Sequence, residues 1–299
     1  MMKHFINLDD LSTENLNSII DNAIALKKQH KAGEINESLK NKTLAMIFDK
    51  SSTRTRVSFE AGMAQLGGHA LFLSDRDIQL GRGEPTTDTA IVISSMVDII
   101  MMRVSSHDTI NTFASNGSVP IINALSDESH PCQLLADMMT YKEHKGSIQG
   151  KTVAWIGDGN NMCHTYMQAA KAFGFTLNIA TPVDYEPDQT FVNNYQDHIA
   201  LFNNAKQACH NADLVVTDVW ASMGQEDEQA KREIAFKEFQ VNQDLMNASN
   251  SDAVFMHCLP AHRGEEVSAE VIDGNQSLVW NEAENRLHAQ KSLLLYLLS

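Results

Sequence analysis

The stretch Thr43-Leu-Ala-Met-Ile-Phe-Asp-Lys-Ser-Ser-Thr-Arg-Thr-Arg-Val-Ser-Phe-Glu60 contains an apolar strand followed by the start of a helix. Residues 43–48 have the length and composition of a buried strand, and the segment that follows predicts a helix ended by a Gly-Gly pair. Ser52 and Thr53 carry hydroxyl groups that suit the N-cap of that helix. The apolar positions expected along the helix are Val57, Phe59, Ala61, Met63, Ala64 and Leu66.

Two arginines, Arg54 and Arg56, lie in the first turn of this predicted helix. The helix dipole already places positive charge there, so cations destabilise the turn unless an anion binds over it. Backbone N–H groups, hydroxyl groups and guanidinium groups together favour a bound phosphate. The alternative from this segment alone is a surface helix with two unrelated arginines.

Strand-like and helical segments alternate along the rest of the chain, which predicts an α/β fold with two doubly wound parallel sheets. An amphipathic helix is expected after Ser12, a helix that bridges the two halves over 131–145, and an apolar-faced C-terminal helix over 287–298. Ligands of such sheets bind beyond the carboxyl ends of the strands. The predicted strands are 43–48, 69–73, 98–104, 119–124, 151–156, 177–180, 212–218, 253–258 and 277–280.

The composition excludes several classes of protein. The 299 residues carry a formal net charge of −15, which argues against nucleic acid and anionic membranes as partners. No apolar run approaches the ~20 residues that span a bilayer, and the N-terminus lacks the apolar core of a signal peptide. The four cysteines are well separated, so we expect free thiols and a cytoplasmic protein.

Six segments together resemble the aspartate/ornithine carbamoyltransferase family, and the resemblance extends over essentially the whole chain. The loop after residue 217 is similar to the ornithine branch. The resemblance implies a carbamoyl-phosphate domain over 1–135 with a returning helix at 285–299, and an ornithine domain over 136–284. The segments are Ser52–Arg56, Asp77-Ile-Gln-Leu-Gly81, Met102-Arg103, His130-Pro-Cys-Gln133, Asp218-Val-Trp-Ala-Ser-Met-Gly224 and His257-Cys-Leu-Pro260.

The resemblance also implies residue roles. Arg103 and His130 would contact the carbonyl oxygen of carbamoyl phosphate, and these two residues with Cys258 would be catalytic. Arg103 ends a strongly apolar strand, where a charge favours function, whereas His130 alone would be ambiguous. The implied carbamoyl-phosphate residues are Ser52, Thr53, Arg54, Thr55, Gln79, Arg103, His130, Gln133, Cys258, Leu259 and Arg286. The implied ornithine residues are Asn161, Asp218, Ser222 and Met223.

The implied reaction transfers a carbamoyl group from carbamoyl phosphate to the side-chain amine of L-ornithine, giving L-citrulline and phosphate by direct attack through a tetrahedral intermediate. No cofactor and no metal are expected. The family also implies a homotrimer or an assembly of trimers, in which the loop containing Gln79 crosses into a neighbouring subunit's site. The segment Gln225–Glu233 is predicted to be a solvated helix face.

Other functions have weaker support. Gly157-Asp-Gly-Asn-Asn161 is similar to a dinucleotide loop, but Met162 replaces its third glycine. A covalent acyl-cysteine on Cys258 has no assignable base. His257 and Cys258 are adjacent in a predicted strand and would point to opposite faces, so with His262 they predict no metal site. A non-catalytic anion-binding regulator, the aspartate branch, and transferases for putrescine or acylated ornithine are the remaining alternatives.

Overall fold

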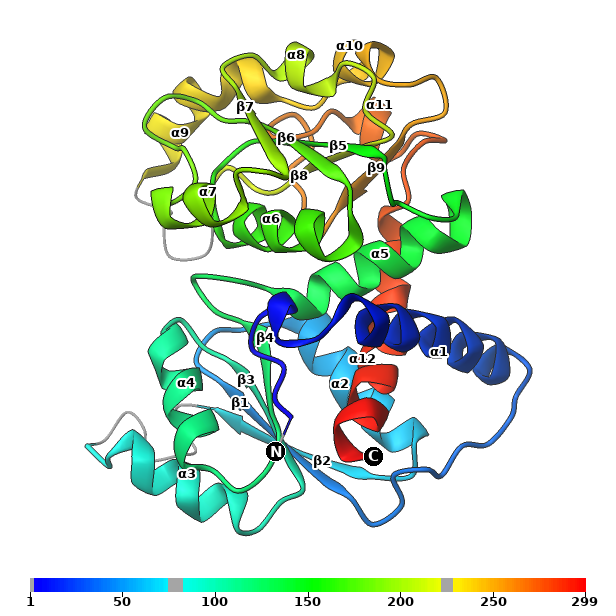
Figure 1. Ribbon diagram of the computed structural model, residues 1–299, viewed down its shortest axis with the longest axis vertical. Helices are drawn as coiled ribbons and strands as arrows, with labels where there is room; N and C mark the ends of the chain where they lie inside the picture. Colours follow the sequence, from blue (N-terminus) through cyan, green and yellow to red (C-terminus); the bar gives the residue numbers. More distant parts are fainter. Residues whose placement is uncertain (1–2, 75–82, 222–227) are drawn as a thin grey trace. The chain divides into compact units, whose positions relative to one another are not determined.

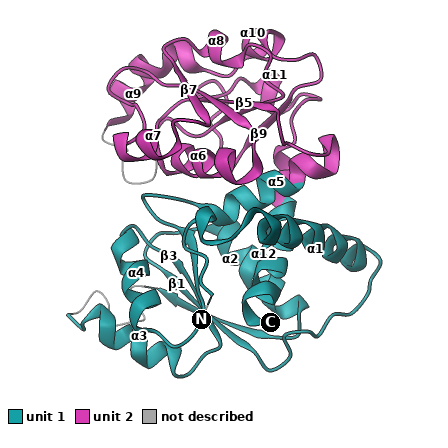
Figure 2. Ribbon diagram, viewed as in Figure 1, with its two compact units in different colours: residues 1–139, 284–299 teal, residues 140–283 magenta. Residues whose placement is uncertain are grey.

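The computed structural model describes residues 3–74, 83–221 and 228–299. The chain divides into two compact units, Met1–Met139 with Glu284–Ser299 (unit 1) and Thr140–Ala283 (unit 2), coloured separately in Figure 2. The divisions fall inside helices α5 (Pro131–Lys145) and α12 (Val279–Leu298), so each of these helices contributes residues to both units.

Unit 1 contains a parallel four-stranded sheet in the order β2-β1-β3-β4. Its central strands are apolar and buried on both faces, as expected for a parallel sheet covered by helices. Helices α3 and α4 cover one face, and α1, α2 and the C-terminal part of α12 lie on the other (Figure 1). The elements are η1 (Leu8–Asp10), α1 (Thr13–Lys31), β1 (Thr43–Phe48), α2 (Thr53–Gln65), β2 (His69–Ser74), α3 (Thr86–Ser94), β3 (Ile99–Arg103), α4 (His107–Asn116) and β4 (Ile121–Leu125).

The C-terminal helix returns to unit 1, as the sequence predicts. Lys27 Nζ of α1 donates to Asn285 Oδ1 at 2.7 Å, and Ser292 Oγ donates to the Ile19 carbonyl at 2.7 Å. Gly62 of α2 lies so close to α12 that an added Cβ would be 3.2 Å from Lys291 Cγ. Helix α12 is therefore packed against both α1 and α2.

Unit 2 contains a parallel five-stranded sheet in the order β7-β6-β5-β8-β9. An apolar cluster from β5, β8, β9 and the helices on one face forms the core. Both sheets have the parallel, doubly wound organisation predicted for the chain. The elements are β5 (Thr152–Ile156), α6 (Asn161–Phe173), β6 (Thr176–Ala180), α7 (Gln189–Tyr195), β7 (Ile199–Phe202), α8 (Ala205–Cys209), β8 (Leu214–Thr217), α9 (Gln229–Phe236), η4 (Lys237–Phe239), α10 (Gln243–Ala248), β9 (Val254–His257) and α11 (Ala269–Ile272).

One predicted strand is wrong, and one strand was not predicted. Segment 277–280 is not a strand, because Ser277 forms a single bridge to Phe255 before α12 begins at Val279. The C-terminal helix is therefore longer than the predicted 287–298. Strand β7 was missed because it is a four-residue edge strand whose side chains are mostly half-exposed.

Helix α2 begins as predicted, but it buries a different face. Ser52 Oγ accepts from Thr55 N at 3.2 Å, so Ser52 is the N-cap. The predicted apolar position Val57 is 59% exposed, and Ala64 is also exposed. The buried face follows helical spacing and is polar at its start; it contains Thr55, Ser58, Phe59, Gly62 and Met63. Across the described part of the chain, every helix is too short or too polar to cross a bilayer.

Candidate functional site

The start of α2 brings a buried hydroxyl group together with two guanidinium groups. Thr55 is 1% exposed, and its Oγ1 lies 3.4 Å from Arg103 Nη1 and 3.3 Å from Arg286 Nη2. Arg103 ends β3, and Arg286 comes from α12, so both elements place their arginines at the N-terminus of α2. Ser52, Thr53, Arg54 and Thr55, with these two arginines, form what we call the anion site.

His130 precedes α5 and lies within the positive field of the anion site. It is 4% exposed, and its pKa is lowered well below 6.5 by burial and by the charges of Arg286, Arg103 and Arg54. The imidazole is consequently neutral at pH 7, so one ring nitrogen carries a proton and is a neutral donor. Three guanidinium groups around a neutral imidazole favour an anionic ligand.

Gln133, on the first turn of α5, is fixed at both ends of its amide. Arg286 Nη1 donates to Gln133 Oε1, and Gln133 Nε2 donates to Asp137 Oδ1 at 2.9 Å. The structure thus groups His130 and Gln133 with Thr55, Arg103 and Arg286 in unit 1, and the roles assigned to these residues stay predictions.

The second arginine of the first turn does not belong to this group. Arg56 Nε donates to Glu60 Oε2 at 3.2 Å, and its guanidinium lies 3.8 Å from the centre of the Phe72 ring. An i,i+4 ion pair and ring stacking account for Arg56 without a ligand. The first-turn cation that the helix dipole destabilises and that a bound anion would stabilise is therefore Arg54.

In unit 2 the carboxyl ends of β8 and β9 bring Asp218 and Cys258 together. Asp218 is buried; its Oδ2 accepts from Asn160 Nδ2 at 2.9 Å, and its Oδ1 accepts from Val219 N at 2.8 Å and Cys258 Sγ at 3.2 Å. No basic side chain in the described ranges forms an ion pair with Asp218. A buried carboxylate held only by neutral donors favours a cationic ligand.

The loop after β5 holds one residue, Asn160, to which the sequence assigned no role in the site. Asn160, rather than its neighbour Asn161, caps α6 by accepting from Met162 N at 2.9 Å, and it also orients Asp218. Asn161 is the first residue of that helix. The cap was foreseeable from an asparagine that precedes a helical pattern, whereas the contact to Asp218 is long-range.

Arg232 of α9 forms an ion pair with the loop after β5 and a hydrogen bond with the loop that follows Asp218. Arg232 Nη1 donates to Asp158 Oδ2 at 2.9 Å and to the Trp220 carbonyl at 2.8 Å. Burial raises the pKa of Asp158 to about 6, against the effect of Arg232. Arg232 is buried, so the prediction that the segment 225–233 is a solvated face is wrong for this residue.

Strand β9 ends at His257, and the turn that follows is held by that side chain. Leu259 N donates to His257 Nδ1 at 2.9 Å, and Leu259 has a left-handed backbone, with φ at 59°. Because Cys258 lies beyond the strand, the argument that places it opposite His257 fails: side-chain atoms of Asp218, His257 and Cys258 lie within 4.8 Å of one another. Both ring nitrogens of His257 already have protein partners, Leu259 N and Glu266 Oε1.

Three predicted site residues, Gln79, Ser222 and Met223, lie outside the described residues. Their roles stay predictions.

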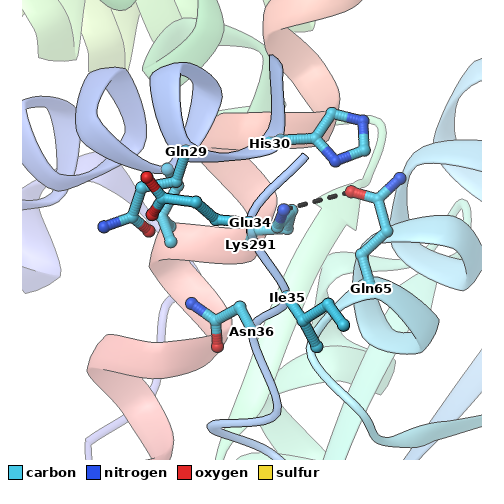
Figure 3. Close-up of a pocket in the computed structure, with 8 residues that line it drawn as sticks. Gln29, His30, Glu34, Ile35, Asn36, Gln65 and Lys291 are labelled. Atoms are coloured by element: carbon cyan, nitrogen blue, oxygen red, sulfur yellow. Dashed lines mark hydrogen bonds between the residues drawn. The ribbon is translucent and has the colours of Figure 1, made fainter. Parts of the chain in front are cut away.

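A cavity of ≈ 180 Å³ lies elsewhere in unit 1, at the end of α2 that is remote from the anion site (Figure 3). Lys291 extends from α12 toward Gln65, the last residue of α2, and Nζ donates to Gln65 Oε1 at 3.0 Å. None of the predicted site residues lines this cavity. Its lining residues are Leu26, Gln29, His30, Glu34, Ile35, Asn36, Gln65 and Lys291.

The fold and the two side-chain groups define a class: a two-unit α/β protein with an anion site in one unit and a buried carboxylate and thiol in the other. Family models extend this description over both units. Residues 3–143 match the carbamoyl-P binding domain of aspartate/ornithine carbamoyltransferase, and residues 149–297 match its Asp/Orn binding domain. The chain belongs to the aspartate/ornithine carbamoyltransferase family.

Individual relatives agree with the family models. An ornithine carbamoyltransferase of Ruthia magnifica is 75% identical over 100% of both chains, and one of Hydrogenovibrio crunogenus is 63% identical over 100% of this chain and 99% of the relative. The crystal structure of ornithine carbamoyltransferase from Burkholderia thailandensis has a TM-score of 0.93 at 52% identity, covering 99% of each chain. The enzyme from Pyrococcus furiosus has a TM-score of 0.93 at 49% identity, covering 98% of this chain and 96% of that one.

Proposed function

We propose that this chain is a carbamoyltransferase that moves the carbamoyl group of carbamoyl phosphate to the side-chain amine of L-ornithine, giving L-citrulline and phosphate. The proposal rests on the anion site in unit 1, on the uncompensated carboxylate in unit 2, and on relatives of the same length named for this activity. Residues 1–135 with 285–299 would bind carbamoyl phosphate, and residues 136–284 would bind ornithine.

The phosphate of the donor fits the start of α2. Ser52, Thr53, Arg54 and Thr55 offer hydroxyl groups, helix-terminal N–H groups and a guanidinium, which together suit a dianion. Arg286 adds a second guanidinium through its contact with Thr55. Gln79 would supply a further contact from a neighbouring subunit.

The carbonyl oxygen of the donor becomes an oxyanion when the amine attacks. Arg103 and His130 would stabilise that charge, because one is a fixed cation and the other a neutral, preorganised donor. A donor aimed at a developing oxyanion supplies ~3–4 kcal/mol of transition-state stabilisation. Gln133, held by Arg286 and Asp137, would bind the carbamoyl amino group.

The acceptor amino acid fits the unit 2 group. Asp218 would bind a cationic amino group, and Cys258 with the Leu259 carbonyl would lie along the path of the attacking amine. Asn161, Ser222 and Met223 would bind the rest of the amino acid. The amine attacks as the neutral base and phosphate leaves, so the reaction needs neither a covalent cysteine nor a cofactor.

The observation that carries the proposal is the Thr55 hydroxyl held between Arg103 and Arg286, beside a histidine kept neutral by burial and by their charges. The test is a citrulline assay on purified protein with carbamoyl phosphate and L-ornithine. Citrulline formation at a rate that saturates in both substrates is expected. Putrescine, N-acylated ornithine and L-aspartate, tested in parallel, distinguish the other transferases, and no product from any amine would indicate a regulator that only binds the anion.

Assembly and location complete the proposal. The family resemblance supports a homotrimer or an assembly of trimers acting in the cytoplasm, and the four cysteines are free thiols. Sedimentation analysis of the purified protein measures the assembly, and fractionation of cells that express it measures the location.

A further inference from the structure

We propose that His262, Glu265 and Glu266, in the turn after β9, bind a zinc ion. The starting point is Glu266, which is 0% exposed. Its Oε1 accepts two hydrogen bonds, from His257 Nε2 at 3.1 Å and from His262 N at 2.6 Å. Its Oε2 is equally buried but has no donor among the residues that the structure describes.

Among the described residues, no lysine or arginine forms an ion pair with Glu266, whose pairing partners are the histidines His257 and His262. His257 Nδ1 accepts from Leu259 N, so the proton of this ring is on Nε2, and His257 is the neutral tautomer. The nearby Arg263 is directed elsewhere, in a two-pronged pair with Asp273 at 2.7 and 2.8 Å. A buried carboxylate with an unsatisfied oxygen and no lysine or arginine beside it is unfavourable, and a bound metal cation removes both costs.

The side chains around the unsatisfied oxygen are suitable metal ligands. His262 Nδ1 lies 4.0 Å from Glu266 Oε2 and 3.6 Å from Glu265 Oε2, and ligand atoms from the three residues lie within 4.8 Å of one another. Zinc–ligand bonds are about 2.0–2.2 Å for histidine nitrogen and carboxylate oxygen, so these atoms must close by roughly 1 Å. The His262 side chain is 51% exposed and that of Glu265 is 33% exposed, which leaves both able to rotate toward Glu266.

The ligand set and its surroundings favour zinc. One imidazole and two carboxylates leave a fourth position for water, as in zinc sites with three protein ligands. His257 would hold the ligating carboxylate of Glu266 from behind, and such second-layer hydrogen bonds are typical of metal sites.

The test is calorimetric titration of ZnCl₂ into metal-free, full-length protein. One zinc per chain is expected from this site, with affinity reduced at least about tenfold in His262→Asn and in Glu265→Gln. His210→Asn, at another exposed histidine, is the matched control and should bind like the wild type. Glu266→Gln removes the central ligand, but the two rim variants keep the test valid if that protein fails to fold.

X-ray absorption at the zinc edge separates this site from the thiol of Cys258. Only nitrogen and oxygen ligands at about 2.0–2.2 Å are expected, whereas a zinc–sulfur distance near ~2.3 Å would indicate binding at Cys258. Three results would overturn the proposal: zinc bound at Cys258 alone, wild-type zinc affinity in His262→Asn, or no zinc binding. A protein that forms no citrulline would contradict the proposed function, but the zinc-binding results would still test the zinc site.

Discussion

Arg54 and Arg56 lie in the same helical turn, yet their side chains have different surroundings. Arg56 pairs with Glu60 and stacks on Phe72, whereas Arg54 contributes positive charge around His130. Sequence spacing places both arginines in the first turn, but it does not show which of them contacts a residue from a distant part of the chain. The segment at the start of α2 was predictable from the sequence, whereas the contacts of Arg56 were not, because Phe72 comes from β2.

Arg54→Ala should abolish most carbamoyl-phosphate binding while leaving the ligand-free protein folded. Removing a cation from a helix N-terminus relieves repulsion with the dipole, so the free energy of unfolding should stay or rise by ~0.3–1 kcal/mol. Urea unfolding and calorimetric titration of carbamoyl phosphate measure the two effects. Arg56→Ala is the control and should bind normally; a large loss of stability in Arg54→Ala would show that Arg54 is structural.

The ratio kcat/KM for ornithine should rise with pH between 6 and 9. The attacking amine resembles that of lysine, with a pKa near ~10.4, so its neutral form costs about 4–5 kcal/mol at pH 7. His130 adds no step in this range, because its pKa lies well below 6.5. A pH series of initial citrulline rates measures this, and a flat profile would argue against attack by the free amine.

His288 should make the protein less stable in acid. Burial, then the charges of Lys291 and Lys27 against that of Glu284, lower its pKa to about 4 from 6.5. Between those values the unfolded chain binds a proton that the folded protein does not, so stability falls as pH drops from 6.5 to 4. We expect a loss of about 1–2 kcal/mol after allowance for solvent screening.

Urea unfolding at pH 7 and pH 4.5 checks the role of His288. His288→Gln should lose less stability between the two values than the wild type, since glutamine does not titrate. His210→Gln, at an exposed site, should behave like the wild type. An equal loss in His288→Gln and wild type would assign the acid sensitivity to other groups.

At the level of elements, the contact between α2 and α12 shows that sequence periodicity can predict a helix without predicting which face of it is buried. The helix over 53–65 and its N-cap were predictable, because the signals lie within a few residues. Its buried face was not, since that face is set by α12, more than 200 residues later in the chain. The apolar segment 277–280 was misjudged for the same reason: a helix start and a buried strand have similar short apolar runs.

Gly62→Leu should destabilise the protein by about 1–3 kcal/mol, because the added side chain meets α12 where a Cβ alone is already 3.2 Å from Lys291 Cγ. Ala64→Leu is the matched control on the exposed face of the same helix and should change stability by less than about 0.5 kcal/mol. Thermal and urea unfolding of both variants decide the question. Equal stability of the two variants would mean that the side chains of α12 can move aside to accommodate a leucine at position 62.

For the whole molecule, the sequence predicts active sites shared between subunits. Each subunit of the proposed trimer would supply Arg54 to its own site and Gln79 to the next. Arg54→Ala and Gln79→Ala are each expected to be inactive. When the two are unfolded and refolded together, any mixed ring contains an interface with both wild-type residues, so up to one site per trimer should regain activity.

Native mass spectrometry of the refolded mixture shows whether mixed trimers form, and the citrulline assay shows whether they work. Each variant refolded alone is the control. Mixed trimers that remain inactive would mean that each site is built within one subunit. At this scale sequence reasoning reached the α/β class and the family through local motifs, while the register of the strands depends on contacts between distant segments.

The four cysteines, all within the described residues, differ sharply in exposure, and this makes the protein convenient to label. Burial raises the pKa of Cys132 and of Cys209 to about 12, and that of Cys163 well above 9. Cys258 is the partly exposed thiol, next to Asp218. A maleimide added to the native protein should therefore react at Cys258 before the buried thiols, and bound substrate should slow that reaction, so the labelling rate would report occupancy of the proposed ornithine site without any engineered cysteine.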